Sequence, residues 1–262
     1  MVKLIATDMD GTLLNSKKEL PPDFLETLDM LDSKNVRFCI ASGRSFTTLK
    51  INFDGYTDRM NFICDNGAFI VIDGKPVSVS IIPKETVSEL IKICRSLEGV
   101  TPVLCGMNGT YFDDCTSELY EEVSRFYLNF TRVDDIAKVE DDIFKVALCD
   151  SGNPMKHSLP IFRERFGDSL SLAASGPLWM DAMNQGVNKG EALKIIQKHL
   201  GVSREETMAF GDYFNDTELL QNAEFSYAMA NSHPDMFKIA KYRTDTNENC
   251  GVTKAINEFF RR

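Results

Sequence analysis

Short apolar runs alternate with amphipathic helical patterns along the first part of the chain. Residues 4–6, 36–41 and 61–64 are apolar runs of strand length, and each is followed by polar residues. Residues 22–34 carry apolar side chains at helical spacing, and a second helix is expected from about residue 45. Strands that alternate with helices in this way predict a parallel sheet that is covered on both faces.

The pattern changes near residue 83. A hairpin that turns at Asp73-Gly74 is expected between strands at residues 69–72 and 77–81. Residues 84–97 then have a clear amphipathic helical pattern, and strand, helix and hairpin signals continue to about residue 183. This middle stretch is therefore expected to form a second domain with its own sheet.

The first pattern resumes after residue 186. Helices are expected at residues 189–200 and 253–260 and after Asp212, with strands at residues 207–210 and 225–229. An α/β pattern that is interrupted and then resumed favours an insertion over two domains in tandem. We predict an α/β fold with a Rossmann-like parallel-sheet core at residues 1–82 and 186–262 and an inserted α+β domain at residues 83–185.

Composition narrows the class of protein. The 262 residues are 43% hydrophobic and 26% charged, which is typical of a globular protein, and the formal net charge is −10. This negative charge disfavours a nucleic-acid partner, and a phosphate site would need local positive charge. The 7 cysteines have no C-x-x-C spacing, which disfavours a zinc site or a disulfide framework. With no apolar run long enough for a signal peptide or a membrane span, we expect a cytoplasmic protein.

The first candidate cluster is Asp8-Met9-Asp10-Gly11-Thr12, which directly follows an apolar run. Residues two apart on an extended chain point to the same side. Asp8 and Asp10 could therefore share a metal ion or divide acid–base work, and Gly11 permits a sharp exit from the strand. Taken alone, the pattern fits an ordinary acidic turn equally well.

Two further clusters are candidate anion sites at helix starts. In Ser42-Gly43-Arg44 a hydroxyl and the following N–H groups would open a helix, although an ordinary Ser cap is the commoner meaning. Asn188-Lys189-Gly190-Glu191 resembles a capping box, which puts Lys189 in the first turn, where the helix dipole disfavours a cation. A bound anion would stabilise Lys189 there, and a solvated surface lysine is the alternative.

The fourth cluster, Gly211-Asp212-Tyr213-Phe214-Asn215-Asp216, follows the expected strand 207–210. Its oxygen ligands suit Mg²⁺, although an acidic helix cap would look the same. Together the clusters supply complementary parts: Asp8, Asp10 and Asp212 as a carboxylate cage, and Ser42, Lys189 and Asn215 as phosphoryl donors. Such a cage repels itself unless a cation is present. Positioning, metal and charge neutralisation are what phosphoryl transfer requires.

These clusters, in this order, resemble the four motifs of the haloacid dehalogenase superfamily, specifically its Cof-like sugar-phosphatase branch with a large inserted cap. Asp65-Asn66-Gly67-Ala68 is similar to a further segment typical of that branch. The resemblance covers the full length of the chain. It implies that residues 83–185 are the cap, which would close over the site and exclude water.

The resemblance also implies roles. Asp8 would attack phosphorus and form an aspartyl-phosphate, and Asp10 would protonate the leaving oxygen and then activate water. The Mg²⁺ ligands would be Asp8, the backbone carbonyl of Asp10, and Asp212. The phosphoryl group would be bound by Ser42, Gly43, Lys189, Asn215 and the backbone at Met9, with Arg44 and Asp216 in support. Asp216 would act through a metal-bound water or orient Lys189.

Tyr213 departs from the family pattern, which has Gly at that position. Its ring could contact the substrate or could simply pack locally. In the inserted domain, the hairpin tip Asn108–Tyr111 and the only tryptophan, Trp179, could reach a substrate, but such residues are more commonly structural.

The expected function is a Mg²⁺-dependent phosphatase that hydrolyses phosphate monoesters of small metabolites, sugar phosphates first by family analogy. A phosphomutase or phosphotransferase that uses the same intermediate is an alternative, and so is a sensor that binds phosphosugars without turnover. The Asp8/Asp10 pair disfavours the sensor, because binding alone needs no acid–base carboxylate.

Overall fold

The computed structural model describes residues 1–113, 116–127, 129–174 and 177–261, and Cys115 lies outside them. The chain divides into two compact units. The first comprises Met1–Phe46, Phe53–Ser78 and Asn188–Arg262, and the second comprises Thr47–Asn52 and Val79–Val187. The domain boundaries expected at 82–83 and 185–186 stay a prediction. In the structure the division between the two compact units falls at 78–79 and at 187–188.

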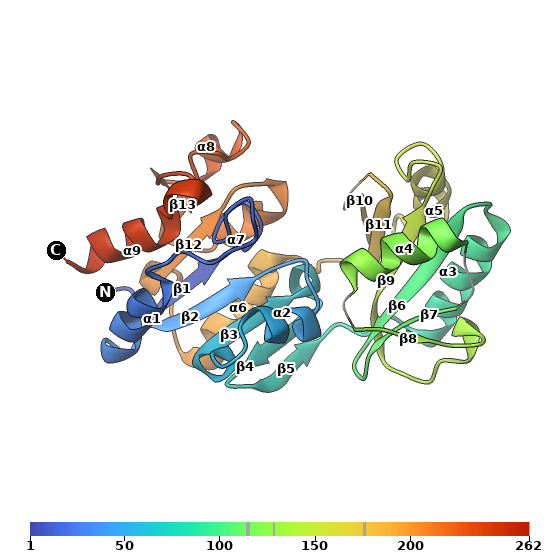
Figure 1. Ribbon diagram of the computed structural model, residues 1–262, viewed down its shortest axis with the longest axis horizontal. Helices are drawn as coiled ribbons and strands as arrows, with labels where there is room; N and C mark the ends of the chain where they lie inside the picture. Colours follow the sequence, from blue (N-terminus) through green and yellow to red (C-terminus); the bar gives the residue numbers. More distant parts are fainter. Residues whose placement is uncertain (114–115, 128, 175–176, 262) are drawn as a thin grey trace. The chain divides into compact units, whose positions relative to one another are not determined.

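The first unit is built on a sheet that has eight strands within the described residues, in the order β14-β13-β12-β1-β2-β3-β4-β5 (Figure 1). The strands are β1 (Leu4–Thr7), β2 (Arg37–Ala41), β3 (Met60–Cys64), β4 (Phe69–Ile72), β5 (Lys75–Val79), β12 (Thr207–Gly211), β13 (Phe225–Ala228) and β14 (Tyr242–Arg243). The strands from β14 to β3 pair in parallel, and β4 turns back antiparallel to β3. The expected α/β fold with a parallel core sheet is confirmed.

Helices cover both faces of this sheet. Their bounds are α1 (Phe24–Ser33), α6 (Lys189–Leu200), α7 (Thr217–Gln221), α8 (Met236–Ile239) and α9 (Gly251–Phe260). Helix α2 (Phe46–Asn52) follows β2 along the chain, and its residues after Phe46 belong to the second unit. On one face, buried residues of α6, α7 and α8 pack on alternate strand residues such as Ala6 and Cys39. On the other face, Phe24 of α1 packs against Phe38 with ring centroids 5.7 Å apart. Burial on both faces explains why the strands are apolar without alternation.

Three elements differ slightly from the expected ranges. The helix expected from residue 22 begins at Phe24, because the first intrahelical hydrogen bond is the one that Thr27 N donates to Asp23 O at 2.9 Å. The Asp23 carboxylate accepts a hydrogen bond from Thr253 of α9 and does not cap the helix. The hairpin strand expected at residues 77–81 is β5, which spans Lys75–Val79. It begins earlier than expected because the turn at Asp73-Gly74 has only two residues. After Asp212 a 3₁₀ turn at Phe214–Asp216 precedes the short α7.

The second unit has a sheet in the order β10-β11-β9-β6-β7-β8 within the described residues (Figure 1). These strands are β6 (Val100–Gly106), β7 (Thr110–Phe112), β8 (Thr131–Arg132), β9 (Ile143–Asp150), β10 (Leu170–Ala174) and β11 (Trp179–Asn184). The helices are α3 (Lys84–Ser96), α4 (Ser117–Phe126) and α5 (Ser158–Phe166). Apolar residues of α3 and α5, among them Leu90 and Phe162, form a core with Val146 and Leu148 of β9. This unit therefore has a hydrophobic core of its own.

No helix in the described ranges is long and apolar enough to cross a membrane. Among the described cysteines, five are buried and Cys250 is half-buried.

Asp150 ends β9 and organises the start of α5. Its carboxylate accepts hydrogen bonds from Gly152 N (2.8 Å), His157 Nδ1 (2.8 Å) and Ser158 N (3.1 Å). Burial alone would raise the pKa of Asp150, but the hydrogen bonds from His157 and Ser158 outweigh it and lower the pKa. A buried carboxylate with several donors is costly to replace, because the donors lose a charged partner.

We expect Asp150→Asn to lower the stability of the second unit by about 1–3 kcal/mol. Urea denaturation followed by Trp179 fluorescence measures this unit, because Trp179 is buried on β11. The difference in unfolding free energy between this variant and the wild type should be fully present at pH values above the pKa of an unfolded Asp, about 3.9. It should be lost as the pH falls through the lower pKa of folded Asp150. The exposed Asp168→Asn is the matched control, with a change within about 0.5 kcal/mol. Equal effects of the two substitutions would contradict this role.

Candidate active site

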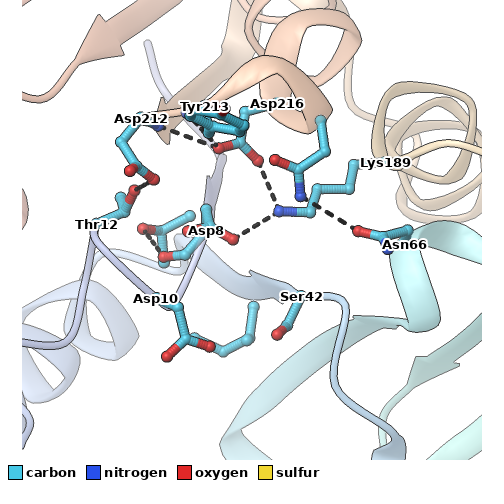
Figure 2. Close-up of polar contacts among 12 residues, drawn as sticks. Asp8, Asp10, Thr12, Ser42, Asn66, Lys189, Asp212, Tyr213 and Asp216 are labelled. Carbon is cyan, nitrogen blue, oxygen red and sulfur yellow. Dashed lines mark hydrogen bonds and ion pairs between the residues drawn. The ribbon is translucent and has the colours of Figure 1, made fainter. Parts of the chain in front are cut away.

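The sheet order brings three of the four clusters to one edge. β1 lies between β12 and β2, and all three run parallel. Asp8 follows β1, Ser42 follows β2 and Asp212 follows β12, so the carboxyl ends of adjacent strands carry them to the same place (Figure 2). Ligands bind at this edge in open α/β sheets. The third cluster reaches the same place from the start of α6.

Lys189 lies at the centre of this group and is completely buried. Its Nζ is 2.6 Å from Asp8 Oδ1 and 2.6 Å from Asp216 Oδ1 (Figure 2). The Asn188 side chain caps α6, since it accepts a hydrogen bond from Glu191 N at 2.8 Å. The two carboxylates are the anions that stabilise a cation in the first turn of this helix. The position of Lys189 at the helix start predicted a bound anion, whereas the protein itself supplies two; one of them, Asp216, was expected to orient Lys189 as one of two alternatives.

Burial and neighbouring charges act in opposite directions on the pKa values of Asp8 and Lys189. Burial strongly raises the pKa of Asp8, Lys189 lowers it, and Asp216 and Asp212 raise it again, so the net shift is upward. Burial would lower the pKa of Lys189, but Asp216 and Asp8 raise it above its usual range. The two carboxylates thus favour the charged form of Lys189, and its ammonium in turn makes the buried carboxylates tolerable here.

Asp212 completes an acidic group. One carboxylate oxygen from each of Asp8, Asp212 and Asp216 lies within 4.8 Å of the other two. Asp212 Oδ1 accepts a hydrogen bond from Thr12 Oγ1 at 2.9 Å, and burial and then Asp216 raise the Asp212 pKa. Gly11 passes so close that a Cβ there would lie 2.5 Å from Asp212 Oδ2, and its φ of +85° also favours glycine. Three carboxylates around one space form a donor set that could hold a hard cation.

The side chain of Asp10 does not join this acidic group. Its carboxylate is bound by Arg44, through Nε at 2.8 Å and a terminal nitrogen at 2.7 Å, and by Lys18 Nζ at 2.7 Å. Figure 2 shows it turned away from Asp212 and Asp216. Burial raises the pKa of Asp10, but the hydrogen bonds from Arg44 and Lys18 outweigh it and lower the pKa. Asp10 is thus held as a carboxylate in this arrangement.

The remaining expected phosphoryl ligands lie on the segments that follow β1, β2 and β12. Ser42 is buried, and its Oγ accepts a hydrogen bond from Arg44 N at 3.1 Å. It therefore forms a turn and does not cap α2, which begins only at Phe46. Met9 is buried directly after Asp8, and the exposed Asn215 donates through Nδ2 to Asn66 Oδ1 at 3.3 Å.

Gly43 and Gly190 permit close packing beside the site. A Cβ at Gly43 would lie 3.2 Å from Asn66 Nδ2, and one at Gly190 would lie 2.4 Å from Glu218 Cβ. The absence of a side chain at Gly190 lets the start of α6 approach α7 and so places Lys189 beside Asp216.

Sequence reasoning missed two contacts of this site. Lys18 lies within a turn in which Asn15 N donates a hydrogen bond to Glu19 O, and nothing in its sequence pattern indicated that its ammonium reaches Asp10. Asn66 was part of a recognised segment but had no assigned role. The signal that could have found it is the run Asp65-Asn66-Gly67, whose residue types are those that tolerate left-handed backbone.

The other candidates have mainly structural contacts. Tyr213 is 55% exposed and packs edge-on against Phe214, with ring centroids 5.1 Å apart. The ring of Phe214 in turn packs against His233, with ring centroids 4.5 Å apart. In the second unit, Tyr111 Oη donates to Asp141 at 3.0 Å and Trp179 Nε1 donates to Glu122 at 3.1 Å. A contact of Tyr213 with substrate therefore stays a prediction.

We expect Lys189→Met to lower the free energy of unfolding of the first unit by about 3–5 kcal/mol, because it leaves buried carboxylates without their cation. The control is Lys194→Met on the same helix, whose ion pair with Glu191 is exposed. That variant should change stability by at most about 1 kcal/mol. Urea denaturation followed by far-ultraviolet circular dichroism compares the two, and similar losses would count against a central role for Lys189.

Comparison with known proteins extends over nearly the whole chain. A family model described as haloacid dehalogenase-like hydrolase matches residues 5–256. The 5-amino-6-(5-phospho-D-ribitylamino)uracil phosphatase YbjI of Escherichia coli is 30% identical over 98% of this chain and 96% of its own length. YitU of Bacillus subtilis, a phosphatase of the same name, is 26% identical over 98% of this chain and 97% of its own length.

A solved structure from Streptococcus mutans has a TM-score of 0.88 and 28% identity, with each chain fully covered. The resemblance seen in the four motifs is thus confirmed in sequence and in fold. The chain belongs to the haloacid dehalogenase-like hydrolases.

Proposed function

We propose that this protein is a Mg²⁺-dependent phosphatase that hydrolyses phosphate monoesters of small metabolites through an aspartyl-phosphate on Asp8. The observation that carries the proposal is the position of Asp8 at the end of β1. There it lies 2.6 Å from the Lys189 ammonium and beside two further carboxylates. A carboxylate nucleophile, a cation for the phosphoryl charge and a set of metal ligands are thereby in one place.

The relatives support a phosphorylated small molecule as the substrate. YbjI and YitU are both named for a uracil that carries a phosphorylated ribityl chain. Because hydrolysis of such a monoester needs only the phosphate and its oxygen at the reacting centre, the same site could serve many sugar-like phosphates. We propose a phosphate monoester on a sugar or sugar-alcohol chain as the substrate class.

The donor set fits a magnesium ion. Asp8 and Asp212 would hold it with the backbone carbonyl of Asp10, and their raised pKa values reflect burial and like charges that a divalent cation would offset. When bound, Mg²⁺ neutralises charge on the phosphoryl oxygens and on Asp8. Asp216 would keep its bond to Lys189 and hold that lysine in place.

Phosphoryl oxygens would be bound by donors around this group. Lys189 Nζ is the charged donor, and Ser42 and Asn215 supply a hydroxyl and an amide. Backbone N–H groups at Met9 and Gly43 would complete the set. Because the chain has a net charge of −10 and Lys189 and Arg44 are paired with carboxylates, a bound Mg²⁺ would supply the additional positive charge that attracts an anion to this edge.

The reaction would proceed in two displacements. An Asp8 oxygen attacks phosphorus, the bond from phosphorus to the leaving oxygen breaks, and that oxygen takes a proton from Asp10. Water then attacks phosphorus and gives a proton to Asp10, the bond from phosphorus to Asp8 breaks, and inorganic phosphate leaves. Asp10 ends in the protonated form in which it began.

Asp10 has the form needed for only one of these steps in the arrangement described. Bound to Arg44 and Lys18, it is a carboxylate, which suits proton removal from water. To donate a proton to the leaving group it must first move away from at least one of these cations and take up a proton from solvent. As the family resemblance implies, residues 83–185 would close over the site and exclude water.

Asp8→Asn should reduce phosphate release from an aryl phosphate by a factor on the order of 10⁴ to 10⁶, because an amide cannot form the aspartyl-phosphate. Excess chelator should abolish wild-type activity, and added Mg²⁺ should restore it. Phosphate release is followed by a colorimetric assay, with the exposed Asp168→Asn as the matched control. Full activity in Asp8→Asn would refute the proposal, and transfer of the phosphoryl group to an added sugar in place of water would indicate a phosphotransferase.

A further inference from the structure

Three consecutive residues beside the candidate site have left-handed backbone. The φ angles are 48° at Asp65, 54° at Asn66 and 108° at Gly67. Two successive non-glycine residues in this region cost free energy, and such strain persists only where the surroundings impose it. The turn follows β3, and β3 pairs with β2, the strand that precedes Ser42.

The surroundings that impose this turn are parts of the candidate site. Asp65 N donates to Arg44 O at 3.0 Å, and Asn66 N donates to Ser42 O at 2.9 Å. Gly67 packs against the first residue of the third cluster, since a Cβ there would lie 2.5 Å from Asn188 O. The turn therefore connects the Ser42 loop with the start of the helix that carries Lys189.

The Asn66 side chain adds a contact to the fourth cluster. Its Oδ1 accepts a hydrogen bond from Asn215 Nδ2 at 3.3 Å (Figure 2). Asn215 is exposed, so its amide would otherwise sample several rotamers. An amide nitrogen has two N–H donors, and holding one of them on Asn66 fixes the direction of the other.

We propose that Asn66 is a positioning residue for phosphoryl transfer: it orients the Asn215 amide so that its second N–H can donate to a phosphoryl oxygen. This inference rests on the proposed function. The left-handed backbone directs the Asn66 side chain toward both Gly43 and Asn215, and asparagine is among the residues that tolerate this backbone best. Asn66 thus supplies both the conformation of the turn and the acceptor for Asn215.

The test uses a set of variants that separates the effect of the Asn66 side chain from the effect of its backbone conformation. Asn66→Gly keeps the left-handed conformation available and removes the amide. The matched control is Asn35→Gly, because Asn35 has the same φ of 54° and is exposed after α1, outside the site. Both variants gain similar freedom in the unfolded chain, so their thermal midpoints should change by similar amounts.

Asn66→Gly should lower kcat/KM for an aryl phosphate about 10- to 100-fold, the loss expected when a binding group is misplaced by about 1 Å. Asn35→Gly should leave kcat/KM at the wild-type value. In an Asn215→Ala background, Asn66→Gly should cause little further loss, because the residue through which Asn66 acts is already gone.

Two results would overturn the inference: a wild-type kcat/KM in Asn66→Gly, or the same fold loss with and without the Asn215 side chain. If the wild type releases no phosphate, the proposed function fails separately. Calorimetric binding of inorganic phosphate with Mg²⁺ then tests the inference by itself. Weaker phosphate binding in Asn66→Gly than in Asn35→Gly supports it, and equal binding overturns it.

Discussion

The site depends on one buried cation. Lys189 has no exposed surface, and its ammonium lies between Asp8 and Asp216. Removing an ammonium and two carboxylates from water is costly, and the cost is offset only when each charge has close partners of opposite sign. The rest of the site follows from meeting this condition. Gly190 allows the close approach of α7, and Asn188 caps the helix that begins with the lysine.

The same need for partners of opposite charge gives the two carboxylates of the first motif different environments. Asp8 shares Lys189 with Asp216 and lies within the acidic group, whereas Asp10 is bound by Arg44 and Lys18. Their environments shift the two pKa values in opposite directions, upward for Asp8 and downward for Asp10. Carboxylates in contrasting environments are suited to different chemical roles. The two carboxylates therefore have distinct environments, and a divalent cation beside Asp8 would lower its raised pKa.

Much of this arrangement could be predicted from the sequence, because strand and motif positions are local properties. Apolar runs directly before Asp8, Ser42 and Asp212 predicted that these residues meet at one edge of a parallel sheet, and the structure brings them there. The unfavourable position of Lys189 in a first helical turn predicted an anion beside it. Asp216 beside Lys189 was one of the two roles that the family resemblance implied for that residue. That Asp8 is a second anion in direct contact with Lys189 could not be predicted, since this depends on how the start of α6 packs against the end of β1.

Contacts between distant segments explain the rest of what was missed. Lys18 reaches Asp10 through the fold of a surface turn, and Asn66 reaches Asn215 across 149 positions in the sequence. Neither contact has a periodic or compositional signal. The strain at Asp65 and Asn66 is likewise visible only in backbone angles, although the Asn-Gly pair is typical of a turn. Local patterns thus predicted the parts of the site, and tertiary packing determined their partners.

The central claim is that Asp8 carries the phosphoryl group during turnover. It is tested most directly by rapid acid quench of the enzyme with an aryl phosphate and Mg²⁺, followed by mass spectrometry of the peptides. We predict a transient phosphoryl group on the peptide that contains Asp8, with the modified residue assigned to Asp8 by fragmentation. Phosphate release with the phosphoryl group on another residue, or a pre-steady-state burst with an unmodified Asp8, would contradict it.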